Sequence, residues 1–191
     1  MDINISDLDI KIFADGADIK HIQSLYTKSF IRGFTTNPTL MRQEGIKDYK
    51  TFAMEVLQVI KDRPVSFEVF ADELSSMEEQ AMEIASWGEN VNVKIPITNT
   101  QGISTVPLLN KLSSNGVICN ITAMFTLEQV QNTVNALDPD TSAILSVFAG
   151  RIADTGRDPI PLLKQSLKIM KVRPKAELLW ASTRELLNIF Q

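Results

Sequence analysis

The chain has 191 residues, of which 44% are hydrophobic and 22% charged, a composition typical of globular proteins. Its formal net charge is −4 and its sequence pI is about 5.1. Nucleic acids and anionic membranes bind basic surfaces, so this charge excludes both as the main partner. No apolar run is long enough to span a membrane, and the first residues lack the basic and apolar blocks of a signal peptide. We therefore expect a cytoplasmic protein.

The chain contains one cysteine and one histidine, Cys119 and His21, so an intramolecular disulfide and a dedicated zinc site are not expected. Cys119 lies in an apolar run after Val117 and Ile118, which predicts an inert core thiol. His21 lies among helix-forming residues and away from any strand end, which argues against a Ser/His hydrolase.

Short apolar or β-branched runs alternate with longer helical stretches along the chain. The predicted strands cover Ile10–Asp15, Ile31–Thr36, Val65–Phe70, Val91–Ile95, Val117–Thr122, Ala143–Phe148 and Glu177–Ser182. The predicted helices cover Ala17–Ser29, Tyr49–Lys61, Ser75–Trp87, Ser104–Ser114, Thr126–Leu137 and Pro159–Lys171. Capping-box spacings start two helices, at Ser75 and Thr126, and Gly88 and Gly116 are expected as left-handed C-caps.

Strands that alternate with helices indicate repeated βαβ units and a parallel sheet of the α/β class. An open doubly wound sheet and a closed barrel both produce this pattern. The chain has no G-x-G-x-x-G or P-loop sequence, so the nucleotide-binding open sheet has little support. No linker divides the chain, and we expect a single domain over residues 1–191, a (β/α) barrel of the TIM type.

The length of the chain conflicts with a complete barrel. Eight β/α units usually need ~200 residues or more. Here the sequence stops within a helix that is predicted to begin at Thr183. The eighth β/α unit is therefore expected to be absent from this chain.

Polar residues stand at the ends of the predicted strands, where parallel barrels place their chemistry. They follow one another at roughly the 30-residue repeat of a βαβ unit. These residues are Asp15, Asn37, Glu68, Lys94, Thr122 and Ser182. The spacing predicts a cluster of functional groups at one end of the barrel.

Alternation along the strands sharpens this prediction, because neighbouring side chains of a strand point to opposite faces. Asn92 and Lys94 share one face of their strand, and Val93 lies on the other. The apolar faces suit packing against outer helices, so the polar faces should point inward. Lys94 then has two interpretations that spacing cannot separate: an amine that attacks a carbonyl, or a buried Lys–Glu pair that stabilises the barrel.

Six segments at the strand ends resemble the transaldolase family, and they occur in order from about residue 10 to residue 184. They are Phe13-Ala14-Asp15-Gly16-Ala17-Asp18, Thr35-Thr36-Asn37-Pro38, Val93-Lys94-Ile95-Pro96, Cys119-Asn120-Ile121-Thr122, Ser146-Val147-Phe148-Ala149-Gly150-Arg151-Ile152 and Ala181-Ser182-Thr183-Arg184. One such segment is weak support for a resemblance, whereas six in order are strong.

The resemblance implies a role for each strand-end residue. Lys94 would form a Schiff base with a sugar ketone, and Asp15 would act as the acid/base on the donor hydroxyl. Glu68 and Thr122 would hold the water of imine formation and release. Substrate would be bound by Thr36, Asn37, Ser146, Phe148 and Ser182, with Arg151 and Arg184 on its phosphate. The resemblance implies sugar phosphates as ligands, no metal or organic cofactor, and a homo-oligomer for the intact protein.

Within this family, two residues favour transaldolase over fructose-6-phosphate aldolase. The aldolases carry Gln where Glu68 stands and Tyr where Phe148 stands. The implied reaction moves a dihydroxyacetone unit from fructose 6-phosphate or sedoheptulose 7-phosphate to an aldose phosphate, as in the pentose phosphate pathway. A fructose-6-phosphate aldolase and a catalytically silent sugar-phosphate-binding barrel are the alternatives. Without the motifs, Arg151 and Arg184 would be read as surface arginines that pair with Asp154 and Glu185.

Overall fold

The computed structural model describes Ile5 and residues 8–191 of the chain. Seven parallel strands form one sheet in the order in which they occur in the sequence, β1 to β7. They are β1 (Ile12–Asp15), β2 (Ile31–Thr35), β3 (Val65–Glu68), β4 (Val91–Pro96), β5 (Cys119–Met124), β6 (Ala143–Val147) and β7 (Ala176–Trp180). All seven predicted strands are confirmed, with boundaries that differ by one or two residues.

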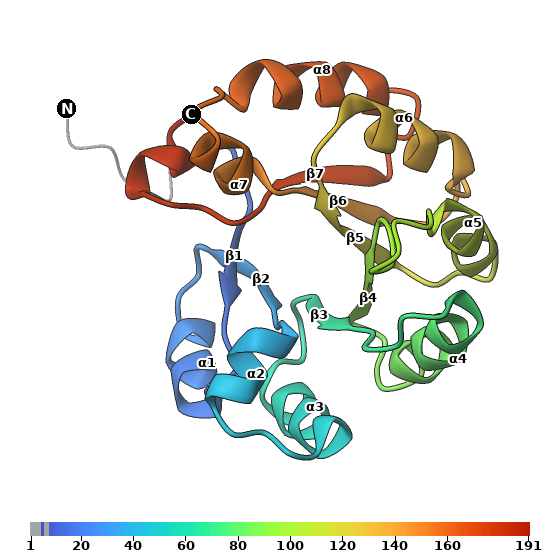
Figure 1. Ribbon diagram of the computed structural model, residues 1–191. Helices are drawn as coiled ribbons and strands as arrows, with labels where there is room; N and C mark the ends of the chain where they lie inside the picture. The colour runs from blue at the N-terminus through green and yellow to red at the C-terminus, as the bar shows by residue number, and fades with distance from the viewer. Residues whose placement is uncertain (1–4, 6–7) are drawn as a thin grey trace.

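The helices lie on the outside of the curved sheet (Figure 1). They are α1 (Ile19–Tyr26), α2 (Pro38–Gln43), α3 (Tyr49–Val59), α4 (Leu74–Ala85), α5 (Val106–Ser114), α6 (Leu127–Ala136), α7 (Ala149–Asp154) and α8 (Ile160–Met170). Two of them, α2 and α7, are short and were not predicted; each follows a strand end directly. No helix in the described part of the chain combines the length and apolarity needed to cross a bilayer.

The sheet curves into a barrel that is not closed by backbone pairing between its first and last strands. In the described residues β1 pairs only with β2, and β7 only with β6. The two edges are joined instead by an ion pair between Lys11, before β1, and Glu177 of β7. A (β/α) barrel without its eighth unit, as expected from the sequence, is the observed architecture. The last element is a 3₁₀-helix, η2 (Leu186–Ile189), and the helix predicted from Thr183 is wrong.

Two of the predicted helix signals are confirmed and two are wrong. Thr126 makes a complete capping box with Gln129, and Gly116 has φ 79°. Ser75 does not cap α4, which begins at Leu74 after Glu73 and has no side-chain cap. The connection before α4 is held instead by Gln80, whose Oε1 accepts hydrogen bonds from the backbone N–H groups of residues 70 and 71. Gly88 is not left-handed and lies beyond the C-cap of α4.

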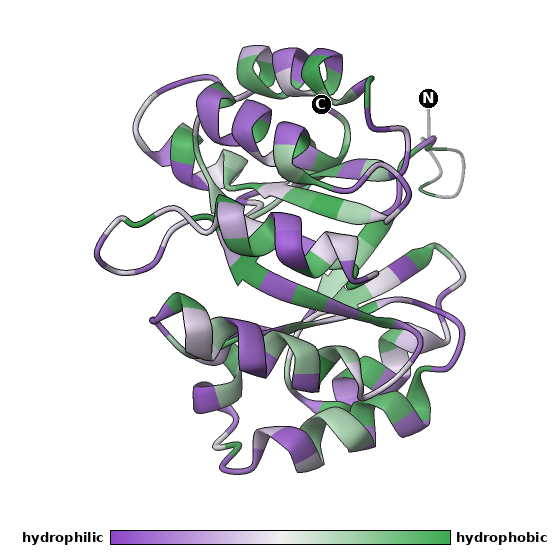
Figure 2. Cartoon of the chain, turned by 90° about the vertical axis from the view of Figure 1, so that its right-hand side faces the viewer, coloured by the Kyte–Doolittle hydropathy of each residue, from purple (hydrophilic) through white to green (hydrophobic). Residues whose placement is uncertain are grey.

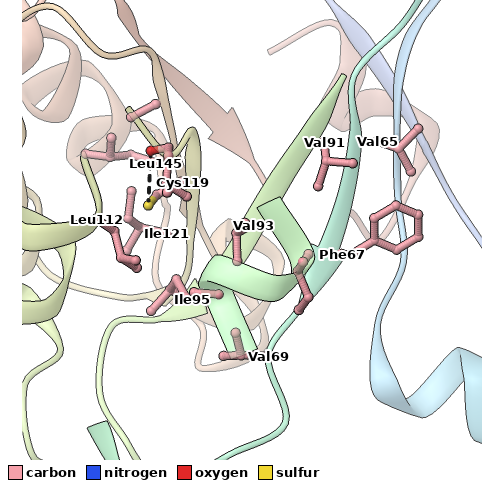
Figure 3. Packing of buried hydrophobic residues seen from close by; sticks show 14 of the residues in the cluster. Val65, Phe67, Val69, Val91, Val93, Ile95, Leu112, Cys119, Ile121 and Leu145 are labelled. Carbon is pink, nitrogen blue, oxygen red and sulfur yellow. Dashed lines mark hydrogen bonds between the residues drawn. The ribbon is translucent and has the colours of Figure 1, made fainter. Parts of the chain in front are cut away.

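The hydrophobic core lies between the outer face of the sheet and the helices. Val65 and Phe67 of β3 and Val93 of β4 are fully buried there, as Figure 3 shows from close by. Burial of one such side chain stabilises the fold by about 1.5–3 kcal/mol. The strands are mostly hydrophobic and the helices carry polar stripes (Figure 2), the pattern of a sheet covered by amphipathic helices.

Cys119 lies in this layer and is fully buried, which confirms the predicted core thiol. Its Sγ lies 3.6 Å from the carbonyl oxygen of Val117. Burial raises the pKa of the Cys119 thiol to about 12. A thiol with this pKa carries almost no thiolate at neutral pH and is a poor nucleophile.

Candidate active site

Lys94 points from β4 into the interior of the barrel, as the alternation of its strand predicts. Its Nζ donates a hydrogen bond of 2.9 Å to the carbonyl oxygen of Thr36 and lies 3.2 Å from Oε2 of Glu68. Glu68 is the register partner of Lys94 on the neighbouring strand, which explains why the two side chains meet. Only 11% of the Lys94 side chain and 18% of the Glu68 side chain are exposed. A charged pair of this burial costs desolvation energy, which makes the site a candidate for function.

Asp15 ends β1 at the open mouth of the barrel, and two neighbours fix its carboxylate. Thr35 donates from Oγ1 to Oδ1 at 2.9 Å, and Asn37 donates from Nδ2 to Oδ2 at 3.1 Å. Asn37 also accepts from the backbone N–H of Leu40 and so caps α2. Asp15 and Lys94 thus contact the same short segment, residues 35–37, although the two side chains form no ion pair of their own.

Thr36 takes a different place from the one that its motif implies. Its hydroxyl is buried and donates to the carbonyl oxygen of Ser66, so it is the backbone carbonyl of Thr36 that meets Lys94. The register pairs Thr35 with Asp15, and this places the Thr35 side chain inside the barrel and that of Thr36 outside it. Sequence reasoning missed Thr35, although the same alternation could have found it.

A network of three buried polar side chains crosses the interior of the barrel near Lys94. Asn120 of β5 donates from Nδ2 to Oγ of Ser66 at 3.0 Å, and Ser146 of β6 donates from Oγ to Oδ1 of Asn120 at 2.6 Å. All three residues are at most 2% exposed, and each forms a hydrogen bond with another of the three. This network of hydrogen bonds connects β3, β5 and β6 and orients the hydroxyl of Ser146.

Thr122 lies at the buried end of β5, and the structure shows no hydrogen bond of its hydroxyl to another described residue. The following residue, Ala123, has φ 59°, an unfavourable conformation for a residue with a side chain. Here the register of β5 with β6 shifts, between Ile121 and Met124. The strain marks a bend at the strand end, directly beside the candidate site.

The far side of the mouth carries the remaining candidates from the sequence. Phe148 precedes α7 and meets the ring of Phe125 edge to face, with 5.7 Å between ring centroids. Phe125 is 40% exposed and was not predicted. Its backbone N–H donates to Oε1 of Gln129, so a side chain of α6 holds the loop after β5. Together the two rings form an apolar rim above the polar interior.

Arg184 follows β7 and is paired with Asp154 at the end of α7. Its Nη1 also donates to the Ser182 carbonyl oxygen and to Ser182 Oγ, at 3.2 and 3.0 Å. Asp154 and Glu185 were considered as the partners of these arginines at the surface; Asp154 pairs with Arg184, and no ion pair joins Glu185 to another described residue. Arg151 is exposed on α7, and no ion pair joins it to another described residue. The predicted strand-end residues lie at or near the carboxyl ends of the strands, and contacts join Lys94 to Glu68 and both Lys94 and Asp15 to residues 35–37.

Tyr49 is a residue of this region that sequence reasoning missed. It opens α3, and its hydroxyl donates a hydrogen bond of 3.0 Å to the carbonyl oxygen of Glu68. Burial raises the pKa of Tyr49 well above its usual range, so the hydroxyl stays a donor at physiological pH. Nothing in the sequence around Tyr49 signals this contact, because it joins elements that are 19 residues apart.

Two cavities elsewhere in the molecule do not include this cluster. The larger, about 660 Å³, is lined by Lys61, Arg63, Pro64, Trp87 and Asn90 at the opposite ends of the strands. The smaller, about 390 Å³, lies between α3 and α4. Neither is lined by Lys94, Glu68 or Asp15, so the candidate site is defined by the converging side chains and not by the size of a cavity.

Comparison with known proteins identifies the family of this chain. Residues 12–191 match the family model described as transaldolase/fructose-6-phosphate aldolase. The chain is 37% identical over 162 residues to a probable transaldolase of Dehalococcoides mccartyi, covering 85% of this chain and 71% of that protein. Probable transaldolases of Caldicellulosiruptor saccharolyticus and Streptococcus agalactiae are 33% and 35% identical over 184 and 181 residues. These alignments cover 95% and 94% of this chain and 80% of each relative. The chain belongs to the transaldolase/fructose-6-phosphate aldolase family.

Proposed function

We propose that this protein is a transaldolase that moves a dihydroxyacetone unit between sugar phosphates through a Schiff base on Lys94. The donor would be a ketose phosphate such as fructose 6-phosphate or sedoheptulose 7-phosphate, and the acceptor an aldose phosphate, as in the pentose phosphate pathway. The observation that supports this most is the buried Lys94 amine at the strand ends, held between the Thr36 carbonyl and the Glu68 carboxylate. Family membership and the names of the relatives agree with it.

The first step of the proposed reaction uses Lys94 and Glu68. The uncharged amine of Lys94 attacks the ketone carbon and a C–N bond forms. The carbonyl oxygen takes up two protons, one from the amine and one from solvent, and leaves as water, so that a protonated imine remains. The Glu68 carboxylate, 3.2 Å from Nζ, is close enough to take the proton from the amine and return it to the leaving oxygen. The Thr122 hydroxyl, which has no partner among the described residues, is available to hold the water.

The second step uses Asp15. Its carboxylate takes the proton from the donor hydroxyl, the adjacent C–C bond breaks, and the electron pair passes into the protonated imine. The hydrogen bonds from Thr35 and Asn37 orient the carboxylate for this transfer. The aldose product leaves, and the three-carbon unit stays on Lys94 until an acceptor aldose arrives and the steps reverse.

The experiment that tests this proposal follows transfer directly. Purified chain is given fructose 6-phosphate with and without erythrose 4-phosphate, and sedoheptulose 7-phosphate and glyceraldehyde 3-phosphate are measured. We expect sedoheptulose 7-phosphate, and more than one equivalent of glyceraldehyde 3-phosphate per enzyme, only when both substrates are present, and neither with the Lys94→Met variant. A folded wild-type chain that makes no product under these conditions would contradict the proposal and favour a binding protein.

The second candidate is a fructose-6-phosphate aldolase, because the matching family model covers both activities. Glu68 and Phe148 separate the two, since Phe148 has no hydroxyl with which to pass a proton to a free ketone. We expect the double variant Glu68→Gln, Phe148→Tyr to raise the ratio of free dihydroxyacetone to transfer product. An unchanged ratio would refute this division, and free dihydroxyacetone as the main product of the wild type would favour the aldolase.

A further inference from the structure

The guanidinium of Arg184 is shared between two groups of the protein. Asp154 occupies the edge formed by Nε and Nη2, and Oδ1 lies 2.9 Å from Nε. Ser182 occupies Nη1 through both its carbonyl oxygen and its hydroxyl. Of these contacts, the one from Nη1 to the Ser182 hydroxyl is made to an uncharged side-chain group that can rotate away.

The elements that carry these groups are fixed to each other through their backbones. Gly150 in α7 donates from its N–H to the carbonyl oxygen of Ala181. A Cβ atom on Gly150 would lie 1.7 Å from the carbonyl oxygen of Ser182, so only glycine permits this approach. Ser182 itself has φ 61°. The start of α7 and the turn after β7 are thus in close backbone contact, and Arg184 is held by Asp154 at the end of α7 and by Ser182 in that turn.

Fixing Arg184 matters because its side chain is long and flexible. An arginine loses side-chain rotamer freedom when it binds a phosphate, and a partner that already orders it removes part of that cost. The side chains of Arg184 and Asp154 are 41% and 48% exposed, so the pair adds little to stability by itself. Asp154 binds Arg184 at two nitrogen atoms, Nε and Nη2, although the pair adds little to stability. Orientation of the guanidinium explains this contact better than stabilisation of the fold does.

We propose that Asp154 is a positioning residue for the substrate phosphate: it holds Arg184 by the Nε–Nη2 edge and directs the Nη1–Nη2 edge to the phosphate. A phosphate oxygen would replace the Ser182 hydroxyl on Nη1, and that hydroxyl would turn to donate to the phosphate. Asp154 itself does not touch the substrate. This inference rests on the proposed function, because it assigns the phosphate of the ketose donor to this side of the mouth.

The test compares a phosphorylated with an unphosphorylated ketose, each of which would form an imine with Lys94. The half-saturating concentration for borohydride trapping of Lys94 is measured with fructose 6-phosphate and with dihydroxyacetone. We expect Asp154→Ala to raise the value for fructose 6-phosphate about fivefold, the size of one exposed ion pair. The value for dihydroxyacetone should stay within about twofold, and Asp154→Asn, which keeps one acceptor oxygen, should give a smaller rise with fructose 6-phosphate. Glu128→Gln, which removes an exposed carboxylate with no arginine partner, is the control.

Three results would overturn the inference: an unchanged value for fructose 6-phosphate, a lower one, or an equal rise for both ligands. If Asp154→Ala does not fold, Asp154→Asn decides. A second readout separates this inference from the proposed reaction. Calorimetric binding of fructose 6-phosphate to Lys94→Ala, with and without Asp154→Ala, needs no imine. Weaker binding in the double variant supports the role of Asp154 even if trapping fails in the wild type, and equal binding contradicts it.

Discussion

The two faces of the seven strands have opposite chemistry, although their residues alternate along the same chain. On β3, Val65 and Phe67 are fully buried against the helices, whereas Ser66 and Glu68 point into the barrel. The outer face removes apolar surface from water and supplies stability. The inner face holds a desolvated ion pair and a hydrogen-bonded network of polar side chains. Apolar side chains of equal volume would stabilise the fold at least as well, so stability does not explain these polar groups. Along each strand, a single residue step therefore separates a side chain that stabilises the fold from one that serves the candidate site.

The largest effect is expected on the outer face, from Phe67→Ala. The ring is fully buried and packs against the rings of Tyr49 and Trp87. Its removal should lower the free energy of unfolding by about 3–5 kcal/mol, measured by urea denaturation. Phe70→Ala is the matched control, because Phe70 follows the same strand and is 51% exposed. Equal losses for the two variants would contradict the assignment of faces.

A smaller loss is expected where the mouth meets the outer layer, from Gly150→Ala. The added Cβ would collide with the carbonyl oxygen of Ser182, so the turn after β7 must move away from α7. We expect a loss of about 1–3 kcal/mol in unfolding free energy. Gly16→Ala, where no atom lies within 4 Å of the added Cβ, is the control and should have almost no effect. A Gly150→Ala variant as stable as the control would show that the close approach is not required.

Tyr49→Phe tests a contact that links the two faces. The Tyr49 ring packs in the outer layer, and its hydroxyl binds the backbone of Glu68, whose side chain faces inward. Loss of this one hydrogen bond should lower stability by about 1 kcal/mol. Tyr26→Phe removes an exposed hydroxyl that donates to Asp62, where water can take its place. We expect a smaller loss there, and the reverse order in thermal or urea unfolding would argue against a role for Tyr49.

The smallest effect is expected from thiol reagents on the native protein. Cys119 is fully buried between the sheet and the helices, and burial raises the pKa of its thiol to about 12. At pH 8 the folded chain should therefore resist iodoacetamide, while the chain in urea, with a thiol pKa of ~8.5, should react. Mass spectrometry gives the extent of labelling. Rapid labelling of the native protein would contradict the burial of this face.

The sequence was sufficient to predict the strands and the direction of Lys94, because both depend on local patterns. Alternation of Asn92, Val93 and Lys94 specifies which side chain enters the barrel, and the structure confirms it for Lys94. The repeat of polar strand ends likewise predicted that Asp15 and Glu68 would gather with Lys94 at one edge. These features follow from the period of a strand and from the parallel order of the sheet.

Contacts between distant segments could not be predicted in the same way. The Tyr49 hydroxyl reaches Glu68 from the start of α3, and the bidentate contact of Asp154 with Arg184 joins the end of α7 to the turn after β7. Their geometry depends on how helices dock on the sheet, which periodicity does not encode. The Ser75 cap failed for a related reason, since Gln80 takes over the N–H groups before α4.

The most direct test is reduction of the protein with borohydride in the presence of fructose 6-phosphate, followed by peptide mass spectrometry. We expect one reduced three-carbon or six-carbon adduct on the peptide that contains Lys94, and no adduct in a folded Lys94→Arg variant. An adduct on a different lysine, or an unmodified Lys94 in folded wild-type protein at saturating sugar, would contradict it.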